Sequence, residues 1–511
     1  MKIERAKNAS RNFIFGLALK LYQTLLPFIM RTIMIYYMGV QYLGLTSLFA
    51  SILQVLNLAE LGVGGAMVFS MYKPIAEDDK ETICALMNLY RRYYRIIGAV
   101  IGMVGIILTP FIPKLIKSDL PAELNIYVLY FLNLSATVLS YWLFAYKNCL
   151  FTAHQRNDIP SKVQLLSNSV QFFFQIVIII YVKNYYLYVL VMLGTQILTN
   201  IITALCADRM YSEYRPGGKL PKEQVDGINR RIRDLFTAKI GAVIVNSADT
   251  VVISAFLGLT VLSIYQNYFF ILTSIIGFIT IIFNSCIAGI GNSLVTESEG
   301  KNYRDLNILT FIIMWIAGFC VCCFACLYQP FMEIWVGKKL MLHYSAVICL
   351  CIYFYIYEIN QLLNVYKDAA GIWHKDRFRP LVTASANLIV NLILVQFWGI
   401  YGVIFSTVLS TVIIGMPWLL HNLFTTIFEK KWVKQYIFKI LKYSASSLVA
   451  CLLCIVICSW FKGALIGVLI IRLMICVIVA NSLLVLLFRK DDDFLASKEL
   501  VLRILKRKRG G

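Results

Sequence analysis

Charged residues are scarce in this sequence of 511 residues, since Asp, Glu, Lys and Arg together make up 15% of it. Soluble globular domains carry about 25% charged residues and about 45–50% apolar ones. This chain is instead 59% apolar, with a mean hydropathy of +0.74. The composition excludes a soluble domain, a disordered chain, a collagen-like fibre and a disulfide-rich secreted scaffold. It favours one membrane body over several soluble domains.

The groups on which soluble-enzyme chemistry depends are also few. The four histidines are scattered along the chain as His154, His343, His374 and His421. No glycine-rich loop ending in Lys is present to hold nucleotide phosphates, so we do not expect ATP hydrolysis or another enzyme activity. The Gly62-Val-Gly64-Gly65 run lies inside an apolar stretch, where it favours close helix packing or a kink over nucleotide binding.

Long apolar runs are what the sequence does contain. A helix needs about 20 apolar residues to cross the hydrocarbon layer of a membrane. Fourteen segments meet this requirement: 12–38, 43–70, 94–112, 123–146, 163–182, 185–206, 236–257, 261–291, 307–328, 342–366, 381–398, 400–427, 436–460 and 463–488. We therefore predict an all-α polytopic membrane protein with about 14 transmembrane helices.

The formal net charge of +21 would suggest nucleic acid in a soluble protein. In a membrane protein, Lys and Arg collect in the cytoplasmic segments. If the N-terminus with Lys2, Arg5, Lys7 and Arg11 is cytoplasmic, only six of the 48 Lys and Arg fall in outer segments, and nearly all others fall on the inner side. We predict that both termini are cytoplasmic and that no nucleic acid binds.

The fourteen cysteines lie within spans or on the inner side. The run from Cys320 through Cys322 and Cys323 to Cys326 resembles a metal cluster. It lies in an apolar span without a nearby His, however, and metal thiolates there would need charge compensation. We therefore predict that these cysteines pack as small apolar residues, as do Cys451, Cys454 and Cys458, and that no metal site is present.

Two helical hairpins repeat along the chain. Met38-Gly39 is followed by Leu43, and Leu257-Gly258 is followed by Leu262 with the same spacing. A parallel repeat of six helices places the substrate path between two lobes. We predict an N-lobe at 1–210 with spans 1–6, a basic cytoplasmic linker at 211–235, a C-lobe at 236–430 with spans 7–12, and spans 13–14 with a basic tail at 431–511.

A few charged residues fall inside the predicted spans, where a charge costs roughly 2.5–3.5 kcal/mol. They are Lys20, Arg31, Glu60, Asp249, Glu358 and Arg472. Arg31 and Asp249 lie at matching depths in spans one and seven, so we expect them to face one cleft from opposite lobes. An Arg in a cleft attracts an anion, and Asp249 is either its counter-ion or a proton or sodium site.

Lys20 and Glu60 share a depth near the inner surface, which favours an ion pair between them. Glu358 near the inner end of span ten, and Arg472 in span fourteen, fit either a structural or a coupling role.

Several motifs in both halves resemble the Wzx-type polysaccharide flippases of the MOP exporter superfamily, which is related to MATE transporters. The first half has Arg31, Met38-Gly39-Val-Gln-Tyr42-Leu-Gly44-Leu45, Leu58-Ala-Glu60-Leu-Gly62 and Tyr72-Lys73-Pro74-Ile75-Ala76. The second half has Asp249-Thr250, Ile334-Trp335-Val336-Gly337, the segment from Lys367 to Pro380, Asn387-Leu388 and Gly399-Ile-Tyr401-Gly402-Val403. The similarity covers residues 10–430.

This resemblance implies a MATE-like fold of two six-helix lobes around a central cleft, plus two C-terminal helices. It implies a flippase of the bacterial inner membrane that moves undecaprenyl-pyrophosphate-linked oligosaccharide outward for O-antigen or capsule assembly. Membrane lipids and other polysaccharide-assembly proteins are the implied partners. A cleft Arg suits a pyrophosphate, and Arg377, Arg379 and Lys73 are candidates for the first headgroup contact at the inner face.

Two other functions are weighed against the flippase. A MATE-like cation-coupled drug exporter would share the fold, but it requires acidic, aromatic-lined sites. A glycan polymerase or ligase would require a large outer loop with catalytic groups, and the longest outer segments, 113–122 and 329–341, are too short. No cofactor is expected beyond a coupling proton or Na⁺.

Overall fold

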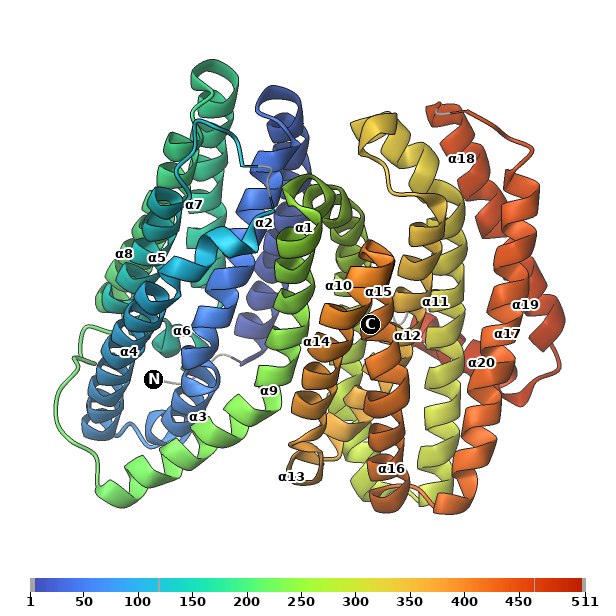
Figure 1. Ribbon diagram of the computed structural model, residues 1–511. Coiled ribbons are helices and arrows are strands. Elements are labelled where there is room, and N and C mark those ends of the chain that lie inside the picture. Colours follow the sequence, from blue (N-terminus) through green and yellow to red (C-terminus); the bar gives the residue numbers. More distant parts are fainter. Residues whose placement is uncertain (1–4, 118–119, 464, 508–511) are drawn as a thin grey trace. The chain divides into compact units, whose positions relative to one another are not determined.

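The structure is a computed structural model that describes residues 5–117, 120–463 and 465–507, and no strand occurs in these ranges (Figure 1). Lys2 of the basic N-terminal segment and residues 508–511 of the basic tail lie outside the described residues. The prediction of an all-α membrane fold is confirmed.

The chain forms two compact units, of which the first is Met1–Ser263. In it, α1 packs against α2 and α7, α5 packs against α4 and α8, and α9 packs against α2 and α3. Its helices are α1 (Arg5–Tyr37), α2 (Val40–Leu56), α3 (Val63–Ala76), α4 (Lys80–Leu108), α5 (Ile126–Trp142), α6 (Asn148–Ala153), α7 (Asp158–Val177), α8 (Tyr185–Met210) and α9 (Lys222–Leu257).

The second unit is Ile264–Gly511. Helix α10 (Leu259–Thr296) begins in the first unit and continues into the second. In the second unit, α11 packs against α12, α17 and α20, and α15 packs against α12 and α14. The remaining helices are α11 (Glu299–Val336), α12 (Tyr344–Ala369), α13 (Trp373–Asp376), α14 (Arg379–Trp398), α15 (Ile400–Ser410), α16 (Met416–Thr426), α17 (Val433–Cys458), α18 (Ile466–Ile475), α19 (Asn481–Phe488) and α20 (Asp492–Arg507).

Every one of the fourteen predicted spans falls on helix. Among the described residues, eleven helices are long and apolar enough to cross a membrane, and the bent pair Ile126–Trp142 and Ala145–Ala153 is a twelfth. The other two predicted spans correspond to α1 and to the apolar half of α9, Val243–Leu257. The division into two lobes of six spans stays a prediction.

The two predicted hairpins share one backbone feature. Gly39, between α1 and α2, has φ 122° and ψ 162°, and Gly258, between α9 and α10, has φ 92° and ψ 170°. This region of backbone space is essentially restricted to glycine. The glycine at the same place in both hairpins therefore has a physical reason, which supports the repeat.

The predicted span over 43–70 is not one continuous helix, in line with the kink considered for its glycine run. Helix α2 ends at Leu56, a 3-10 turn covers Asn57–Glu60, and α3 begins at Val63. Gly62 between them has φ 88°, and a Cβ atom there would lie 2.8 Å from the Ile232 carbonyl oxygen of α9. The span breaks because only glycine allows this conformation beside another backbone.

A second close approach joins α2 to the start of α10, within the first unit. A Cβ atom on Gly44 would lie 2.4 Å from the Leu259 carbonyl oxygen and 2.7 Å from the Ser263 hydroxyl. Ser263 itself donates a hydrogen bond of 2.6 Å to the Val40 carbonyl. A small residue at position 44 is therefore required for the helices to meet.

We expect Gly44→Ala to destabilise the first unit, because overpacking costs about 1–3 kcal/mol. The melting temperature of the purified protein in detergent should fall by several degrees. Gly194→Ala in α8 is the matched control, since nothing lies within 4 Å of a Cβ atom there. Equal melting temperatures for the two variants would contradict the close approach.

Candidate functional site

Arg31 lies on α1 of the first unit, where it is half-buried. Its guanidinium interacts electrostatically with the phenol of Tyr188, which is buried on α8. The Tyr188 ring stacks on the Tyr185 ring with 5.7 Å between centroids. Arg31 is thus next to a cluster of tyrosines rather than surrounded by aliphatic side chains.

A cavity of about 140 Å³ lies beside these tyrosines, between α2, α5 and α8. The Thr46 and Tyr185 hydroxyls share a hydrogen bond of 2.9 Å at its wall. Its polar lining residues are Thr46, Asn133, Thr137, Tyr185, Tyr188 and Gln196. Hydroxyl and carboxamide groups of this kind hydrogen-bond readily to sugar hydroxyls.

The sequence analysis missed this polar lining. Its residues come from three predicted spans and are single polar positions within apolar runs. The one local signal is the tyrosine-rich start of α8, with Tyr185, Tyr186 and Tyr188. Only the packing of α5 and α8 brings this segment to Asn133 and Thr137.

Asp249 lies on α9 and is 9% exposed. The helix packs against α2 and α3, where the Ser247 hydroxyl donates to the Gln54 side-chain oxygen at 3.3 Å. Arg31 and Asp249 lie in the same compact unit, Met1–Ser263, because α9 packs against α2 and α3. That the two residues face one cleft from two lobes stays a prediction.

The expected ion pair between Lys20 and Glu60 is not formed in the part of the chain that the structure describes. Glu60 instead accepts hydrogen bonds from the Tyr94 and Tyr141 hydroxyls, the second at 2.6 Å. Tyr90 donates in turn to the Tyr94 hydroxyl at 2.9 Å. The direction in which each side chain points was not predictable from its position along the helix.

The three residues predicted to contact a headgroup at the inner face have different environments. Lys73 near the end of α3 is 83% exposed and lies 3.9 Å from the Glu77 carboxylate. Arg377 is also exposed, and its guanidinium lies over the Phe378 ring at 4.6 Å. Arg379 is only 6% exposed. Lys73 and Arg377 are accessible to a ligand, and Arg379 is not.

Arg379 is held in a buried polar network around Asp376, at the start of α14. Its Nε and one terminal nitrogen donate to the two Asp376 oxygens at 2.7 and 2.8 Å. The same terminal nitrogen donates to the Asn364 side-chain oxygen at 2.8 Å, and the Asn422 amide donates to Asp376 at 3.0 Å. This geometry ties α12, α14 and α16 together, so Arg379 is structural here.

Asp79, in the loop after α3, is the N-cap residue of α4. The Asp79 carboxylate accepts a hydrogen bond of 3.0 Å from the Thr82 backbone N–H. Hydrogen bonds from Thr82 lower the pKa of Asp79 below its ordinary value. Ser298 caps α11 in the same way through the Lys301 N–H. Both loops therefore end on helix caps.

Glu358 and Arg472 differ in how their polar atoms are satisfied. Glu358 on α12 is 1% exposed, and neither carboxylate oxygen has a hydrogen-bond partner among the described residues. Arg472 on α18 donates two hydrogen bonds to the Phe461 carbonyl, at 2.7 and 3.1 Å, and one to the Cys326 carbonyl at 3.0 Å. Arg472 therefore joins α18 to α11, while Glu358 is a buried acid.

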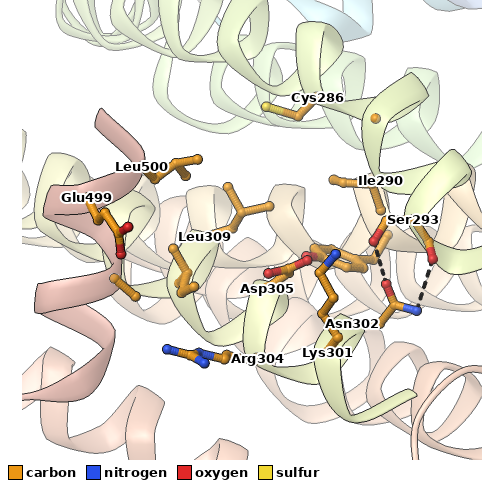
Figure 2. Close-up of a pocket in the computed structure, with 14 residues that line it drawn as sticks. Cys286, Ile290, Ser293, Lys301, Asn302, Arg304, Asp305, Leu309, Glu499 and Leu500 are labelled. Carbon is orange, nitrogen blue, oxygen red and sulfur yellow. Dashed lines mark hydrogen bonds between the residues drawn. The ribbon is translucent and has the colours of Figure 1, made fainter. Parts of the chain in front are cut away.

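The largest cavity described, about 610 Å³, lies in the second unit between α10, α11, α12 and α20 (Figure 2). Asn302 is fixed at its wall by hydrogen bonds with the Ser293 hydroxyl and carbonyl, at 2.7 and 3.2 Å. Its charged lining residues are Lys301, Arg304, Asp305 and Glu499. Two cations and two anions give this lining no net charge, so it does not select an anion.

Comparisons by sequence and by structure give different results. No family model and no curated protein matches the sequence. The fold is similar to "Lipid II flippase MurJ, inward closed conformation", with a TM-score of 0.67, 14% identity, and coverage of 93% of this chain and 99% of that one.

Multidrug transporters share the fold as well. An inward-facing multidrug resistance MATE family transporter of the MOP superfamily matches with a TM-score of 0.54, 15% identity, and coverage of 84% and 99% of the two chains. A point mutant of the Vibrio cholerae MATE transporter VcmN matches with a TM-score of 0.52, 14% identity, and coverage of 83% and 98%. This chain therefore has the fold of the MOP superfamily and is a multi-pass membrane protein, and the neighbours named here are transporters rather than enzymes.

Proposed function

We propose that this protein is a flippase that moves undecaprenyl-pyrophosphate-linked oligosaccharide across the bacterial inner membrane, for O-antigen or capsular polysaccharide assembly. Both termini are cytoplasmic in this proposal, and the mechanism is alternating access. The observation that carries the proposal is Arg31 next to Tyr188, a residue that lines a cavity with hydroxyl and amide groups among its walls. The neighbour named as a lipid II flippase supports a lipid-linked glycan as the substrate class.

The chemistry of the substrate fits the residues present. A pyrophosphate is a multiple anion, and a planar guanidinium can donate two parallel hydrogen bonds to it. The hydroxyl and amide groups lining the cavity suit a sugar, and the lipid tail can stay in the bilayer. Lys73 and Arg377, both exposed, are the proposed first contacts for the headgroup.

We propose that a proton or Na⁺ drives the cycle, with Glu358 as the acidic group that binds it and Asp249 as either a second such group or the counter-ion of Arg31. Burying an ionised carboxylate without a partner is costly, so such a group favours taking up a proton or a cation. Glu358 is fully buried with both oxygens unpartnered among the described residues. Glu60 and Arg472 are assigned positioning roles, because their hydrogen bonds are to the surrounding helices, and Lys20 stays a candidate for the cleft.

A Glu358→Gln variant tests this coupling role. We expect the variant to fold, because Gln keeps the shape and removes the buried acid, and to lose the dependence of transport on a proton or sodium gradient. Transport of a lipid-linked glycan into proteoliposomes, with and without each gradient, measures this. Glu297→Gln, at a carboxylate that is 42% exposed, is the control. A gradient dependence equal to that of the wild type would contradict the role of Glu358.

The alternative function is a MATE-like cation-coupled drug exporter, which the multidrug neighbours favour. The two functions differ in the charge of the substrate, and the Arg31 environment suits an anion. Deleting the gene should therefore leave the susceptibility of the cell to cationic dyes unchanged. A several-fold increase in dye susceptibility, reversed by the cloned gene, would favour the exporter over the flippase.

A further inference from the structure

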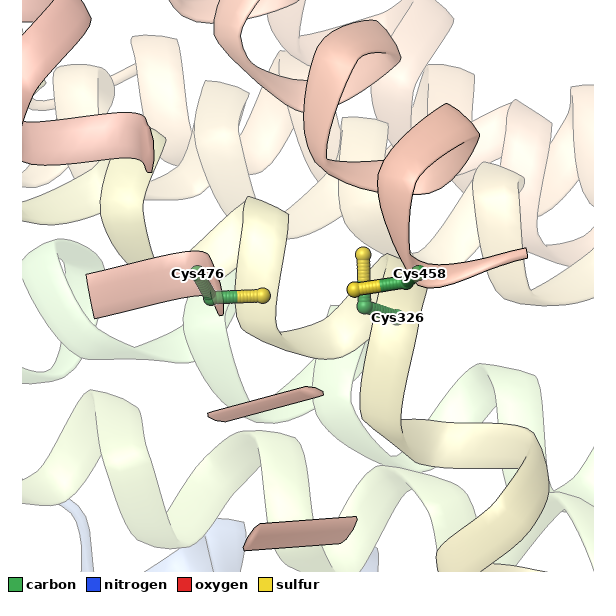
Figure 3. Close-up of side chains that lie close together, drawn as sticks. All are labelled: Cys326, Cys458 and Cys476. Atoms are coloured by element: carbon green, nitrogen blue, oxygen red, sulfur yellow. The ribbon is translucent and has the colours of Figure 1, made fainter. Parts of the chain in front are cut away.

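Three cysteines from distant parts of the second unit meet inside it. Cys326 lies on α11, Cys458 is the last residue of α17, and Cys476 follows α18. Their sulfur atoms all lie within 4.8 Å of one another, and each residue is at most 3% exposed. Figure 3 shows the Cys476 sulfur pointing toward the Cys326 and Cys458 sulfurs.

The sequence analysis predicted simple packing for these cysteines, because thiolates inside a span would need charge compensation. The structure contains such a charge. The Arg472 guanidinium donates to the Cys326 carbonyl at 3.0 Å, and the Cys458 thiol donates to the Arg472 carbonyl at 3.9 Å. A cation is thus attached to the backbone of one cysteine and neighbours a second.

Two of the three cysteines lie at the ends of helical segments. Cys476 begins a single π-helical turn, Cys476–Ala480, and such turns occur often at functional sites. Cys458 ends α17 and is followed by Trp460, which is 76% exposed. The sulfur atoms are therefore buried, and Cys458 lies two residues from an exposed position in the connection between α17 and α18.

We propose that Cys326, Cys458 and Cys476 form a binding site for a soft d¹⁰ metal ion, Zn²⁺ or Cu⁺. Thiolates prefer these ions. Each thiol that becomes a ligand releases its proton to solvent, and no oxidation or reduction occurs. Three thiolates with Zn²⁺ and the Arg472 cation are neutral together, whereas Cu⁺ leaves one negative charge, so the charge favours Zn²⁺.

Metal bound at this site would stabilise the folded second unit. It would join α11, α17 and the segment after α18, in addition to the Arg472 hydrogen bonds, the hydrogen bond between the Thr310 and Tyr436 hydroxyls, and the one from the Cys476 thiol to the Cys322 carbonyl. A metal that binds only the folded protein stabilises it by mass action. The site would therefore hold the last pair of spans on α11.

Metal retention by the full-length protein tests the proposal. The protein is purified in detergent with a reductant and a chelator, loaded with Zn²⁺ or with Cu⁺, desalted against a competing chelator, and analysed for metal. We expect about one equivalent of one of these ions in the wild type and a loss of at least fivefold in Cys326→Ser/Cys458→Ser/Cys476→Ser. Cys84→Ser/Cys206→Ser/Cys286→Ser, which leaves this cluster intact, should retain the metal.

Two more measurements test whether a retained metal is bound by these three cysteines. X-ray absorption should show sulfur neighbours at about 2.3 Å from Zn²⁺. Bound metal should slow alkylation of these three cysteines at least tenfold in the wild type, which requires no variant to fold. Equal metal retention in the two triple variants, or no retained metal and no protection from alkylation, would overturn the proposal and leave packing as the role of the cluster.

Discussion

Arg31→Ala is expected to abolish export of the lipid-linked glycan while the protein still inserts in the membrane. The reason is that the side chain supplies the cation beside the polar cavity of the first unit, next to Tyr188. Loss of a charge-assisted hydrogen bond costs roughly 1.5–3 kcal/mol. Two such bonds to a pyrophosphate therefore correspond to a loss of transport rate of at least about 100-fold.

Glycan at the cell surface, relative to the amount of protein in the membrane, measures this effect. Arg31→Lys keeps the charge but not the planar pair of donors, so an intermediate rate is expected. Lys222→Ala, at an exposed cation that begins α9, is the control and should export normally. Wild-type surface glycan in Arg31→Ala would remove Arg31 from the proposed site.

Arg379→Ala is expected to destabilise the second unit severely without acting on the substrate directly. The side chain is buried and binds both Asp376 oxygens, so its loss leaves a buried carboxylate without its main partner. Breaking a buried ion pair by removing one partner costs about 3–5 kcal/mol. We expect a large fall in melting temperature and in the amount of protein that reaches the membrane.

Arg377→Ala is the matched control for this prediction, because Arg377 is exposed two residues away. Its removal should change stability by less than about 0.5 kcal/mol. If Arg377 contacts the headgroup, transport by its variant should fall at normal protein levels. Equal melting temperatures for Arg377→Ala and Arg379→Ala would contradict the structural role of Arg379.

The sequence predicted most of the helices because apolar length is a strong signal in a membrane protein. All fourteen segments fall on helix, and both hairpin glycines have backbone angles that only glycine adopts readily. The glycine run between α2 and α3 predicted close packing or a kink, but its packing partner could not be predicted, because the break depends on the close approach of α9 to Gly62. That contact lies about 170 residues away along the chain and leaves no local pattern.

Of the charges predicted inside spans, Asp249 and Glu358 are buried, whereas the buried Asp158 and Asp376 were not predicted to be so. Glu60 and Lys20 share a depth, yet Glu60 binds Tyr94 and Tyr141 on other helices. Arg379 looked like an ordinary inner-loop cation, because its partner Asp376 is three residues away in a segment with several charges. Depth and charge follow from the sequence, whereas the direction of a side chain depends on how the helices pack.

The central claim is that the protein moves a lipid-linked oligosaccharide outward across the membrane. Its most direct test is to delete the gene and determine on which side of the inner membrane lipid-linked oligosaccharide accumulates. We predict accumulation on the cytoplasmic side, relieved by the wild-type gene and not by Arg31→Ala. Unchanged levels of the lipid-linked oligosaccharide, or accumulation on the outer side, would contradict the proposed function.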